Sequence, residues 1–434
     1  MKFHDGAEFT DEDVVASLAR VSHETSPLRG NLPAYESSRV IDDHTVEIVV
    51  NTTYPLLLND LTNILLFDAG WLKANNAELP TDAAAGVEGY PTSNANGTGP
   101  FIVESRQPDA RTVFVVNPAW WDEPKHNITR IEFQPIASAA THVAALIGGD
   151  VVFVNAAPLQ DLPRLESAPN VTVLAASELR TIFFGFNMRE KLFSATDGSP
   201  NPFLDIRVRE AVNLALDRNL LQSRVMRGLS RTTGSLVAPA IPGYSEALDI
   251  VLDFDPERAK ALLTEAGYPD GFAFTLLCAN NSFVNEEDIC QATGSMLARV
   301  GITANLDILP GAQQRAKRSA AEFDMVILGW ANEPMIDAYS ILVQLFHSPS
   351  DARGVFNFGL WGNEKIDALT DASASELERP ARIAMMNEAL QEAKDQQMYV
   401  PLHQQPMVWA TSDRVGNMLQ LSDNKARLWY TMMK

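Results

Sequence analysis

The chain has 434 residues, more than a single hydrophobic core usually organises, so we expect two or three domains. Its formal net charge is −21, from 55 acidic and 34 basic residues. This charge argues against nucleic acid and anionic membranes as partners, because both are bound through Lys and Arg. The longest apolar runs are too short to span a bilayer, and we find no export-signal pattern at the start of the chain.

The first residues predict a turn that leads into a helix. Residues 3–6 read as the end of a strand entering a turn, Thr10 is placed to cap a helix, and Asp13 takes the capping-box position. An apolar face at helical spacing follows, made of Val14, Val15, Leu18 and Val21. Because a lone strand needs a partner for its backbone groups, we expect that strands preceding this segment are missing from the chain.

Strands and turns dominate the pattern of the first third of the chain. Residues 39–51 predict a turn followed by a strand, and 101–117 predict two strands around a Pro-Asp turn. A further strand is expected over 128–136 and a short helix over 138–150. The stretch 86–101 is rich in Gly, Pro, Asn and Ser, which is typical of a domain boundary or hinge.

Longer helices alternate with strands in the second half, which indicates an α/β fold. Helices are predicted over 203–228 and 255–267 and, as a pair, over 363–397. The nearly all-apolar run 323–330 predicts a strand that is covered on both faces. The segment 401–413 returns to a strand pattern.

The only two cysteines, Cys278 and Cys290, allow two interpretations. Cys278 ends a strand-like run and Cys290 lies one turn into a predicted helix, so a short link could bring them within bonding distance. A disulfide would then contribute roughly 3 kcal/mol in an oxidising compartment. The alternative is a pair of buried thiols that act as small hydrophobic groups. Their spacing does not match a zinc site.

Catalytic motifs are missing from the sequence. We find no serine nucleophile elbow, Walker loop, dinucleotide fingerprint or His-Glu-x-x-His pattern. The seven histidines show no ligand spacing, and His403 lies in an apolar context that is typical of a core histidine. An enzyme would have to use Glu333 with His403, the only acid–base pair that we can nominate. We therefore expect no catalytic activity, no cofactor and no metal.

Aromatic and amide side chains are concentrated in the second half and suggest a binding site for amide-containing ligands. Trp330 and Glu333 lie at the C-terminal end of the predicted buried strand, at the kind of sheet edge where α/β proteins bind ligands. Indole and amide groups suit peptide bonds, and Glu333 suits a cationic amine. The further candidates are Phe186, Asn187, Asn357, Phe358 and Trp361. Each of the candidate residues could instead serve packing or a surface turn.

Six collinear blocks resemble the extracellular solute-binding proteins of the peptide/nickel class, family 5, which are receptors of ABC importers for di- and oligopeptides. The first block, KFHDGAEFTDEDVV, resembles the family's KFHDG segment, and GTGPF followed by NPAWW resembles a second one. The other four are PFLDIRVREAVNLALDR, DPERAKALLTEAGYPDGF, GWANEP and IDALTDASAS. The resemblance covers essentially the whole chain.

The resemblance implies a periplasmic-binding-protein type II fold, a two-lobed clamp with an extra small domain that lacks its N-terminal strands here. It assigns residues 1–96 to the small domain, 97–184 with 405–434 to one lobe, and 185–404 to the other. It also implies a monomer in the periplasm that binds a short peptide or peptide-like solute and delivers it to a permease. The alternatives are a metal chelate, a sugar or an opine-like ligand, or a truncated remnant without function.

Two departures from the family pattern bear on the ligand. Peptide binders of this family usually place an Asp just after the Gly-Trp pair to hold the ligand's amine. Here Glu333 takes that position, with Asp337 as the alternative after a shift in register. The segment 278–288 has no Arg where some dipeptide binders hold the ligand's carboxylate, so a carboxylate would be held elsewhere or not at all.

Overall fold

The computed structural model of the chain describes residues 1–26, 28–81, 87–136, 138–195, 198–333, 335–350 and 353–434. The described chain divides into two compact units. Unit 1 contains residues 1–174, 408–421 and 425–434, and unit 2 contains residues 175–407 and 422–424. The division falls within two long strands, β7 (Val171–Phe186) and β12 (Tyr399–Ser412). It does not separate residues 1–96 from the rest of unit 1, so the predicted small domain stays a prediction.

The opening motif of unit 1 forms the turn and helix start that the sequence predicts. The amide of Phe3 donates to the carbonyl of Ala7 at 2.8 Å, which closes the turn. The amide of Thr10 donates to the Asp13 carboxylate at 2.6 Å, and helix α1 then runs over Asp11–Ser22. Leu18 of α1 is buried in a small apolar cluster with neighbouring elements of this unit.

The same motif fastens a loop that lies about ninety residues further along the chain. Asp5 and Asn96 exchange two hydrogen bonds, from the Asp5 amide at 3.2 Å and from the Asn96 carboxamide at 2.9 Å. The amide of His4 donates to the Gly97 carbonyl at 2.8 Å. The KFHDG block and the start of the GTGPF block, with the preceding Asn96, therefore hold each other in place.

The remaining elements of unit 1 are short and mostly antiparallel. Strands β1 and β2 form a hairpin, and β3, β4 and β5 form a three-stranded antiparallel sheet. Strand β6 pairs with the part of β12 that belongs to this unit. The bounds are β1 Tyr35–Asp42, β2 Thr45–Val50, α2 Leu57–Leu61, α3 Ala69–Ala74, β3 Phe101–Gln107, β4 Arg111–Val116, β5 Arg130–Phe133, α4 Ala139–Gly148, β6 Phe153–Val154, α5 Leu162–Ser167, β13 Val415–Asn417 and β14 Met432–Met433.

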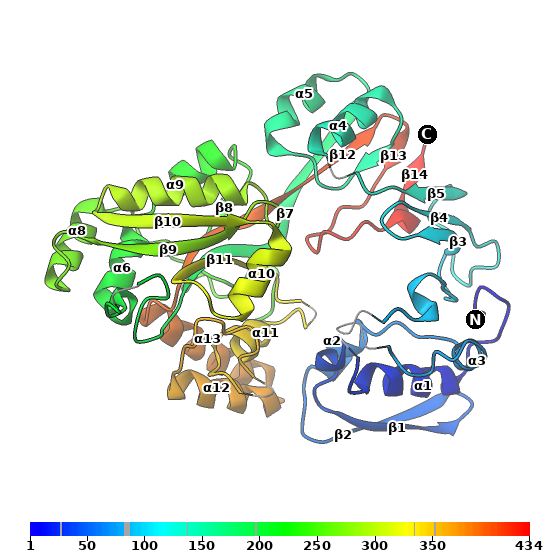
Figure 1. Cartoon of the computed structure of the whole chain (residues 1–434). Helices are drawn as coiled ribbons and strands as arrows, with labels where there is room; N and C mark the ends of the chain where they lie inside the picture. The colour runs from blue at the N-terminus through cyan, green and yellow to red at the C-terminus, as the bar shows by residue number, and fades with distance from the viewer. Residues whose placement is uncertain (27, 82–86, 137, 196–197, 334, 351–352) are drawn as a thin grey trace. The chain divides into compact units, whose positions relative to one another are not determined.

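Unit 2 is built on a mixed sheet in which β10, β9, β11, β7 and β12 follow one another, with β8 beside β12 (Figure 1). Strands β9, β10 and β11 run parallel, and β7 is antiparallel to β11. The bounds are α6 Ile206–Leu214, α7 Arg218–Leu220, β8 Arg231–Thr232, α8 Pro256–Glu265, β9 Phe272–Ala279, α9 Glu286–Ala298, β10 Ile302–Leu309, α10 Gly311–Ser319, β11 Met325–Trp330, α11 Tyr339–Ile341, α12 Glu364–Ser375 and α13 Arg379–Asp395.

The core of unit 2 lies on the central strands of this sheet. Residues 325–328 of β11 are all buried, which confirms the predicted strand with two covered faces. Large apolar side chains of β7 and β9 fill the space around it, among them Phe183, Phe184, Phe274, Leu276 and Leu277. Helix α9 lies against β9 and β10, and α12 and α13 pair with each other (Figure 1).

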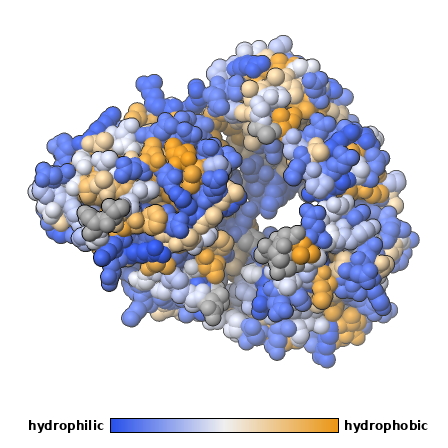
Figure 2. Space-filling view, viewed as in Figure 1, coloured by the Kyte–Doolittle hydropathy of each residue, from blue (hydrophilic) through white to orange (hydrophobic). Residues whose placement is uncertain are grey.

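The visible surface is mainly hydrophilic, and its hydrophobic side chains form separate patches (Figure 2). This agrees with the strongly acidic composition of the chain. Among the helices of the described residues, none combines the length and apolar character that a membrane crossing requires.

Candidate functional site

The carboxyl ends of β9, β10 and β11 meet at one edge of the unit 2 sheet because the three strands are parallel. The loops that follow β9 and β10 are joined there: the Gly311 amide donates to the Asn281 side chain at 2.8 Å, and the Asn280 amide donates to the Leu309 carbonyl at 3.0 Å. The edge therefore collects loops from three strands in one place, as ligand sites of α/β sheets do.

Trp330 lies at this edge, as the last residue of β11. Its ring packs edge-to-face against Phe356, with ring centroids 5.5 Å apart. The side chain is only partly buried as a whole, but its indole Nε1 is buried and finds no acceptor among the described residues. The indole therefore carries a hydrogen-bond donor that the described part of the chain does not use.

Asn332 follows Trp330 in the loop after β11. The residue has φ of +57° and is 0% exposed, and its carbonyl oxygen accepts from the Ile336 amide at 2.9 Å. Both polar atoms of its carboxamide are buried and lack a partner within the described part of the chain. A buried amide group without partners is costly, so this carboxamide is a candidate for pairing with a ligand.

The two carboxylates that the sequence nominates for a ligand's amine are in different situations. Glu333 lies in the same loop and is partly buried. Asp337 is 2% exposed and forms a bidentate ion pair with Arg382 of α13, with N–O distances of 2.6 and 3.0 Å. Both Asp337 oxygens therefore accept hydrogen bonds from Arg382, whose positive charge balances that of the carboxylate. We therefore do not assign a ligand's amine to Asp337.

The predicted residues of the 355–363 stretch divide into structural and site-facing groups. Asn357 is buried, donates to the carbonyls of His347 and Trp361 at 2.9 and 3.0 Å, and accepts from the Trp361 amide at 3.0 Å. Trp361 is 6% exposed and lies under the Arg209 guanidinium. Phe358 is partly exposed and packs 5.9 Å from Phe356, so it alone of the three extends the aromatic cluster of Trp330.

Phe186 and Asn187 lie at the other end of β11. Because β7 is antiparallel to β11, Phe186 pairs with Met325, the first residue of β11, whereas Trp330 pairs with Thr181. Phe186 is 1% exposed and packs against Phe203. Asn187 donates to the carbonyls of residues 321 and 323 at 3.1 and 2.8 Å. Both residues therefore stabilise the core of unit 2, about 17 Å of strand away from the edge.

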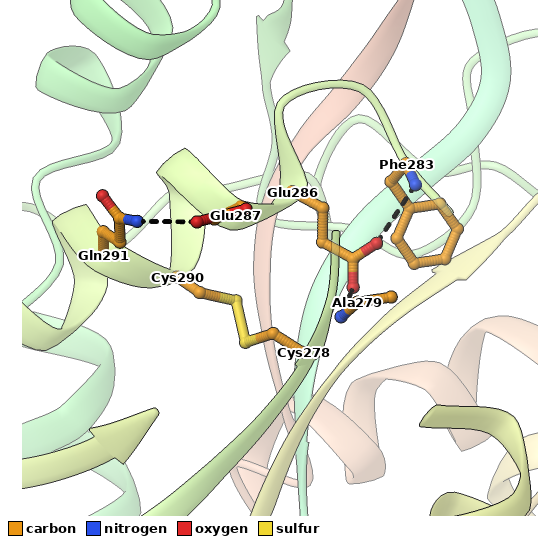
Figure 3. Close-up of a disulfide and its surroundings, with 7 residues drawn as sticks. All are labelled: Cys278, Ala279, Phe283, Glu286, Glu287, Cys290 and Gln291. Carbon is orange, nitrogen blue, oxygen red and sulfur yellow. Dashed lines mark hydrogen bonds between the residues drawn. A yellow bond between two sulfur atoms is a disulfide. The ribbon is translucent and has the colours of Figure 1, made fainter. Parts of the chain in front are cut away.

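A disulfide and a buried carboxylate fix the loop after β9 (Figure 3). Cys278 of β9 and Cys290 of α9 are bonded to each other. The carboxylate of Glu286 accepts from the amides of Ala279 and Phe283 at 2.6 and 3.1 Å, and burial raises its pKa to about 7. The disulfide lies at the base of the loop, and the side chain of Glu286, the first residue of α9, binds amides at both ends of the loop, so the loop has a defined shape.

A chain of side chains that sequence reasoning missed links this loop to β12 and β7. The Val284 amide donates to Gln405 at 3.1 Å, Gln405 donates to Glu178 at 2.6 Å, and Arg180 donates to the other oxygen of Glu178 at 3.1 Å. These residues come from three distant segments, and no local motif marks them. They hold the neighbouring backbone elements together at the candidate site.

His403 shows the properties of a core histidine. It is 2% exposed, and burial lowers its pKa to about 4, so the ring is neutral near pH 7. Neither ring nitrogen has a hydrogen-bond partner among the residues that the structure describes, so the ring is buried but not satisfied by the protein. The same residues contain no group of three or more His, Cys, Asp or Glu that could hold a metal ion.

Comparisons with known proteins identify the family. Residues 1–353 match the family model described as bacterial extracellular solute-binding proteins, family 5. The chain is 26% identical over 420 residues to the glutathione-binding protein GsiB of Salmonella paratyphi A, covering 95% of this chain and 77% of that protein. It is 24% identical over 427 residues to the heme-binding protein A of Haemophilus influenzae, covering 93% and 74%.

A solved structure shows the same fold. The ABC transporter-associated periplasmic binding protein DppA from Helicobacter pylori, in complex with the peptide STSA, superposes with a TM-score of 0.77 at 21% identity, covering 99% of this chain and 82% of that one. The family match spans most of the chain and brings with it the role of a transport receptor. The chain therefore belongs to the bacterial extracellular solute-binding proteins of family 5, and it is a solute-binding receptor of ABC importers rather than an enzyme.

Proposed function

We propose that this receptor captures a short peptide or a peptide-like solute and delivers it, as a monomer in the periplasm, to the permease of an ABC importer. The observation that carries the proposal is that two side chains, one at the end of β11 and one in the loop after it, have buried polar atoms without a hydrogen-bond partner among the described residues. Trp330 offers a donor, and Asn332 offers a donor and an acceptor, without a partner among the described residues. A peptide bond presents one N–H and one C=O, which is the complementary set.

The aromatic neighbours of these groups support the same ligand class. Phe356 packs against Trp330 and is itself 39% exposed, and Phe358 extends the aromatic surface. Apolar rings beside a few polar groups are the usual lining of a small-molecule site. The Asn332 carboxamide is fully buried, so the loop has to open slightly around it before a ligand can reach it.

Glu333 is our candidate for the ligand's cationic amine. It is the carboxylate nearest in sequence to Trp330, and it is partly buried, which strengthens an interaction with a cation. If Glu333 holds an amine, Glu333→Gln weakens amine-bearing ligands by about 1.5–3 kcal/mol, the size of a charge-assisted hydrogen bond. Calorimetric affinities that are equal in the variant and the wild type would remove Glu333 from the site.

The relatives support a peptide-like ligand. The similarity to a glutathione-binding protein and to a structure with a bound tetrapeptide favours peptides, whereas the similarity to a heme-binding protein shows that the family also takes other solutes. Metal chelates, sugars and opine-like compounds are therefore included as outcomes of the test.

A thermal-shift panel tests the proposal. Wild-type protein is mixed with pools of di- to pentapeptides, glutathione, monosaccharides, a nickel–histidine chelate and an opine. A ligand at a hundred times its dissociation constant adds roughly 2.7 kcal/mol to the free energy of unfolding, which is readily seen as a higher melting temperature. The proposal predicts a shift with a peptide pool or glutathione. A shift with only a sugar, the chelate or the opine would overturn it.

A further inference from the structure

Helix α10 carries two arginines next to the candidate site, and neither forms an ion pair with another of the described residues. Arg315 and Arg318 are three residues apart, so they share one face of the helix, which lies against β9 and β10 (yellow in Figure 1). A Cβ atom on Gly311 would lie 3.3 Å from Nη1 of Arg315 and 3.1 Å from the side-chain oxygen of Asn281. The Arg315 guanidinium therefore lies at the start of α10, beside the loop that follows β9.

Arg318, on the same face of α10 as Arg315, lies beside the aromatic cluster of Trp330, Phe356 and Phe358. Its guanidinium lies 4.8 Å from the ring centre of Phe358. Phe358 packs against Phe356, and Phe356 packs against Trp330. A continuous row of ring contacts therefore runs from the indole at the end of β11 to the Arg318 guanidinium.

The two guanidinium groups are unusual for this acidic chain, which has 55 acidic residues and 34 basic ones. Within the described ranges, neither arginine has a carboxylate within 4 Å or a hydrogen-bond acceptor, and Nε of Arg318 is buried without a partner. Lys317 of the same helix, in contrast, pairs with Asp307 at 2.7 Å. Within the described residues, Arg315 and Arg318 therefore lack an ion-pair partner, whereas Lys317 of the same helix has one.

Two like charges held close together, one of them partly buried, favour an anion between them. Burial lowers the pKa of Arg318, the neighbouring charge of Arg315 acts in the same direction, and the Glu286 carboxylate acts in the opposite direction. A ligand carboxylate would offset both the cost of burying the Arg318 charge and its repulsion by Arg315. A guanidinium matches the two carboxylate oxygens with a planar pair of N–H groups. The contact with the Phe358 ring uses the π face of that ring and none of the N–H groups of Arg318 as hydrogen-bond donors.

We propose that Arg315 and Arg318 bind a carboxylate of the captured solute, so that the receptor selects anionic peptides or peptide-like acids. This inference rests on the proposed function and adds the charge of the ligand to it. The segment 278–288 has no arginine that could hold the ligand's carboxylate. On this proposal the positive charge comes instead from α10, which follows β10 at the same edge of the sheet. The carboxylate can be the ligand's terminus or an acidic side chain.

The test uses four probes, namely tetra-alanine, tetra-alanine amide, and tetra-alanine with either Glu or Gln replacing its second residue. They are titrated calorimetrically into the wild type and into Arg315→Gln, Arg318→Gln and, as a matched control, Arg299→Gln, which removes an exposed charge at the end of α9. Thermal unfolding of each variant first confirms that it folds.

We expect the wild type to prefer a carboxylate probe over its uncharged counterpart by roughly 10- to 100-fold. The free acid against the amide reports on the ligand's terminus, and Glu against Gln reports on its side chain. The preference should vanish in Arg315→Gln and Arg318→Gln and persist in Arg299→Gln. Equal binding of charged and uncharged probes, or an undiminished preference in Arg318→Gln, would overturn the inference.

If no peptide binds the wild type, the proposed function fails and the arginine pair is tested separately. Citrate, an oligocarboxylate without a peptide bond, is then added in a thermal-shift assay. An increase in melting temperature in the wild type and in Arg299→Gln, but not in Arg318→Gln, would support the anion site on its own. The same response in all three proteins, or none in any, would overturn it.

Discussion

Replacing Asn332 with glycine separates a ligand-binding role from a structural one. Glycine adopts the +57° φ of this position freely, so the backbone of the loop can be kept. The carboxamide makes no hydrogen bond within the described residues, so its removal breaks none. We therefore expect the free energy of unfolding to change by less than about 1 kcal/mol. Peptide affinity should fall by about 1–3 kcal/mol, because a donor and an acceptor to the ligand are lost together.

Asn357→Ala is the matched control for this experiment. The Asn357 carboxamide makes three hydrogen bonds to backbone groups of residues 347 and 361, so its loss should lower the free energy of unfolding by about 2–4 kcal/mol. Urea denaturation measures the stability of both variants, and calorimetry with a peptide from the screen measures affinity. An Asn332→Gly variant that binds like the wild type, or that loses as much stability as Asn357→Ala, would refute the assignment.

Three further predictions concern the framework of the site. Replacing both Cys278 and Cys290 with alanine should cost about 3 kcal/mol of stability in urea denaturation, since the disulfide closes a loop with a sequence separation of 12; a loss below about 1 kcal/mol would contradict this. The pKa of Glu286 is raised from 4.5 to about 7, so its protonated form is favoured in the folded state, and stability should fall by about 3 kcal/mol between pH 4.5 and 7. Glu286→Gln should remove that fall, and an unchanged pH profile in urea titrations would count against the burial argument. Asp337→Asn should destabilise the protein by about 3–5 kcal/mol, because it leaves Arg382 buried without its partner, and a near-neutral effect on the melting temperature would disprove the role of that ion pair.

Local signals predict several elements of the fold well. Thr10 with Asp13 predicts the start of α1, and the helix predicted over 255–267 is α8, which begins at Pro256 with Asp255 as its cap. The helix predicted over 203–228 is instead broken. Asp217 caps a new short helix through the Leu220 amide at 2.9 Å, because an aspartate after a helix turn competes with its continuation. An apolar face at helical spacing cannot reveal such a break.

The site is harder to predict because sequence does not show which polar groups already have partners. Asn332 and Asn357 are the same residue type, yet the carboxamide of Asn357 is hydrogen-bonded whereas that of Asn332 has no partner among the described residues. Asp337 looks like a free carboxylate until its partner on α13 is seen. The Arg315–Arg318 spacing is visible in the sequence, but whether these arginines form ion pairs with other described residues depends on elements far apart in the chain.

The position of Trp330 was predictable, whereas that of Phe186 was not. A residue that follows a buried strand lies at the strand's end, whatever the rest of the fold is. Phe186 also ends a buried strand, but β7 runs against β11, so its end lies at the opposite edge of the sheet. Strand direction is a property of the whole topology, and it decides which aromatic residues share a site.

The most direct test of the central claim is native mass spectrometry of the wild-type chain in an equimolar mixture of di- to pentapeptides. If the chain is a receptor for peptide-like solutes, the spectrum should show a one-to-one complex in which the released ligand keeps the mass of the peptide that was added. A spectrum with free protein alone would contradict peptide capture, and the release of shorter peptides would contradict a receptor without catalytic activity.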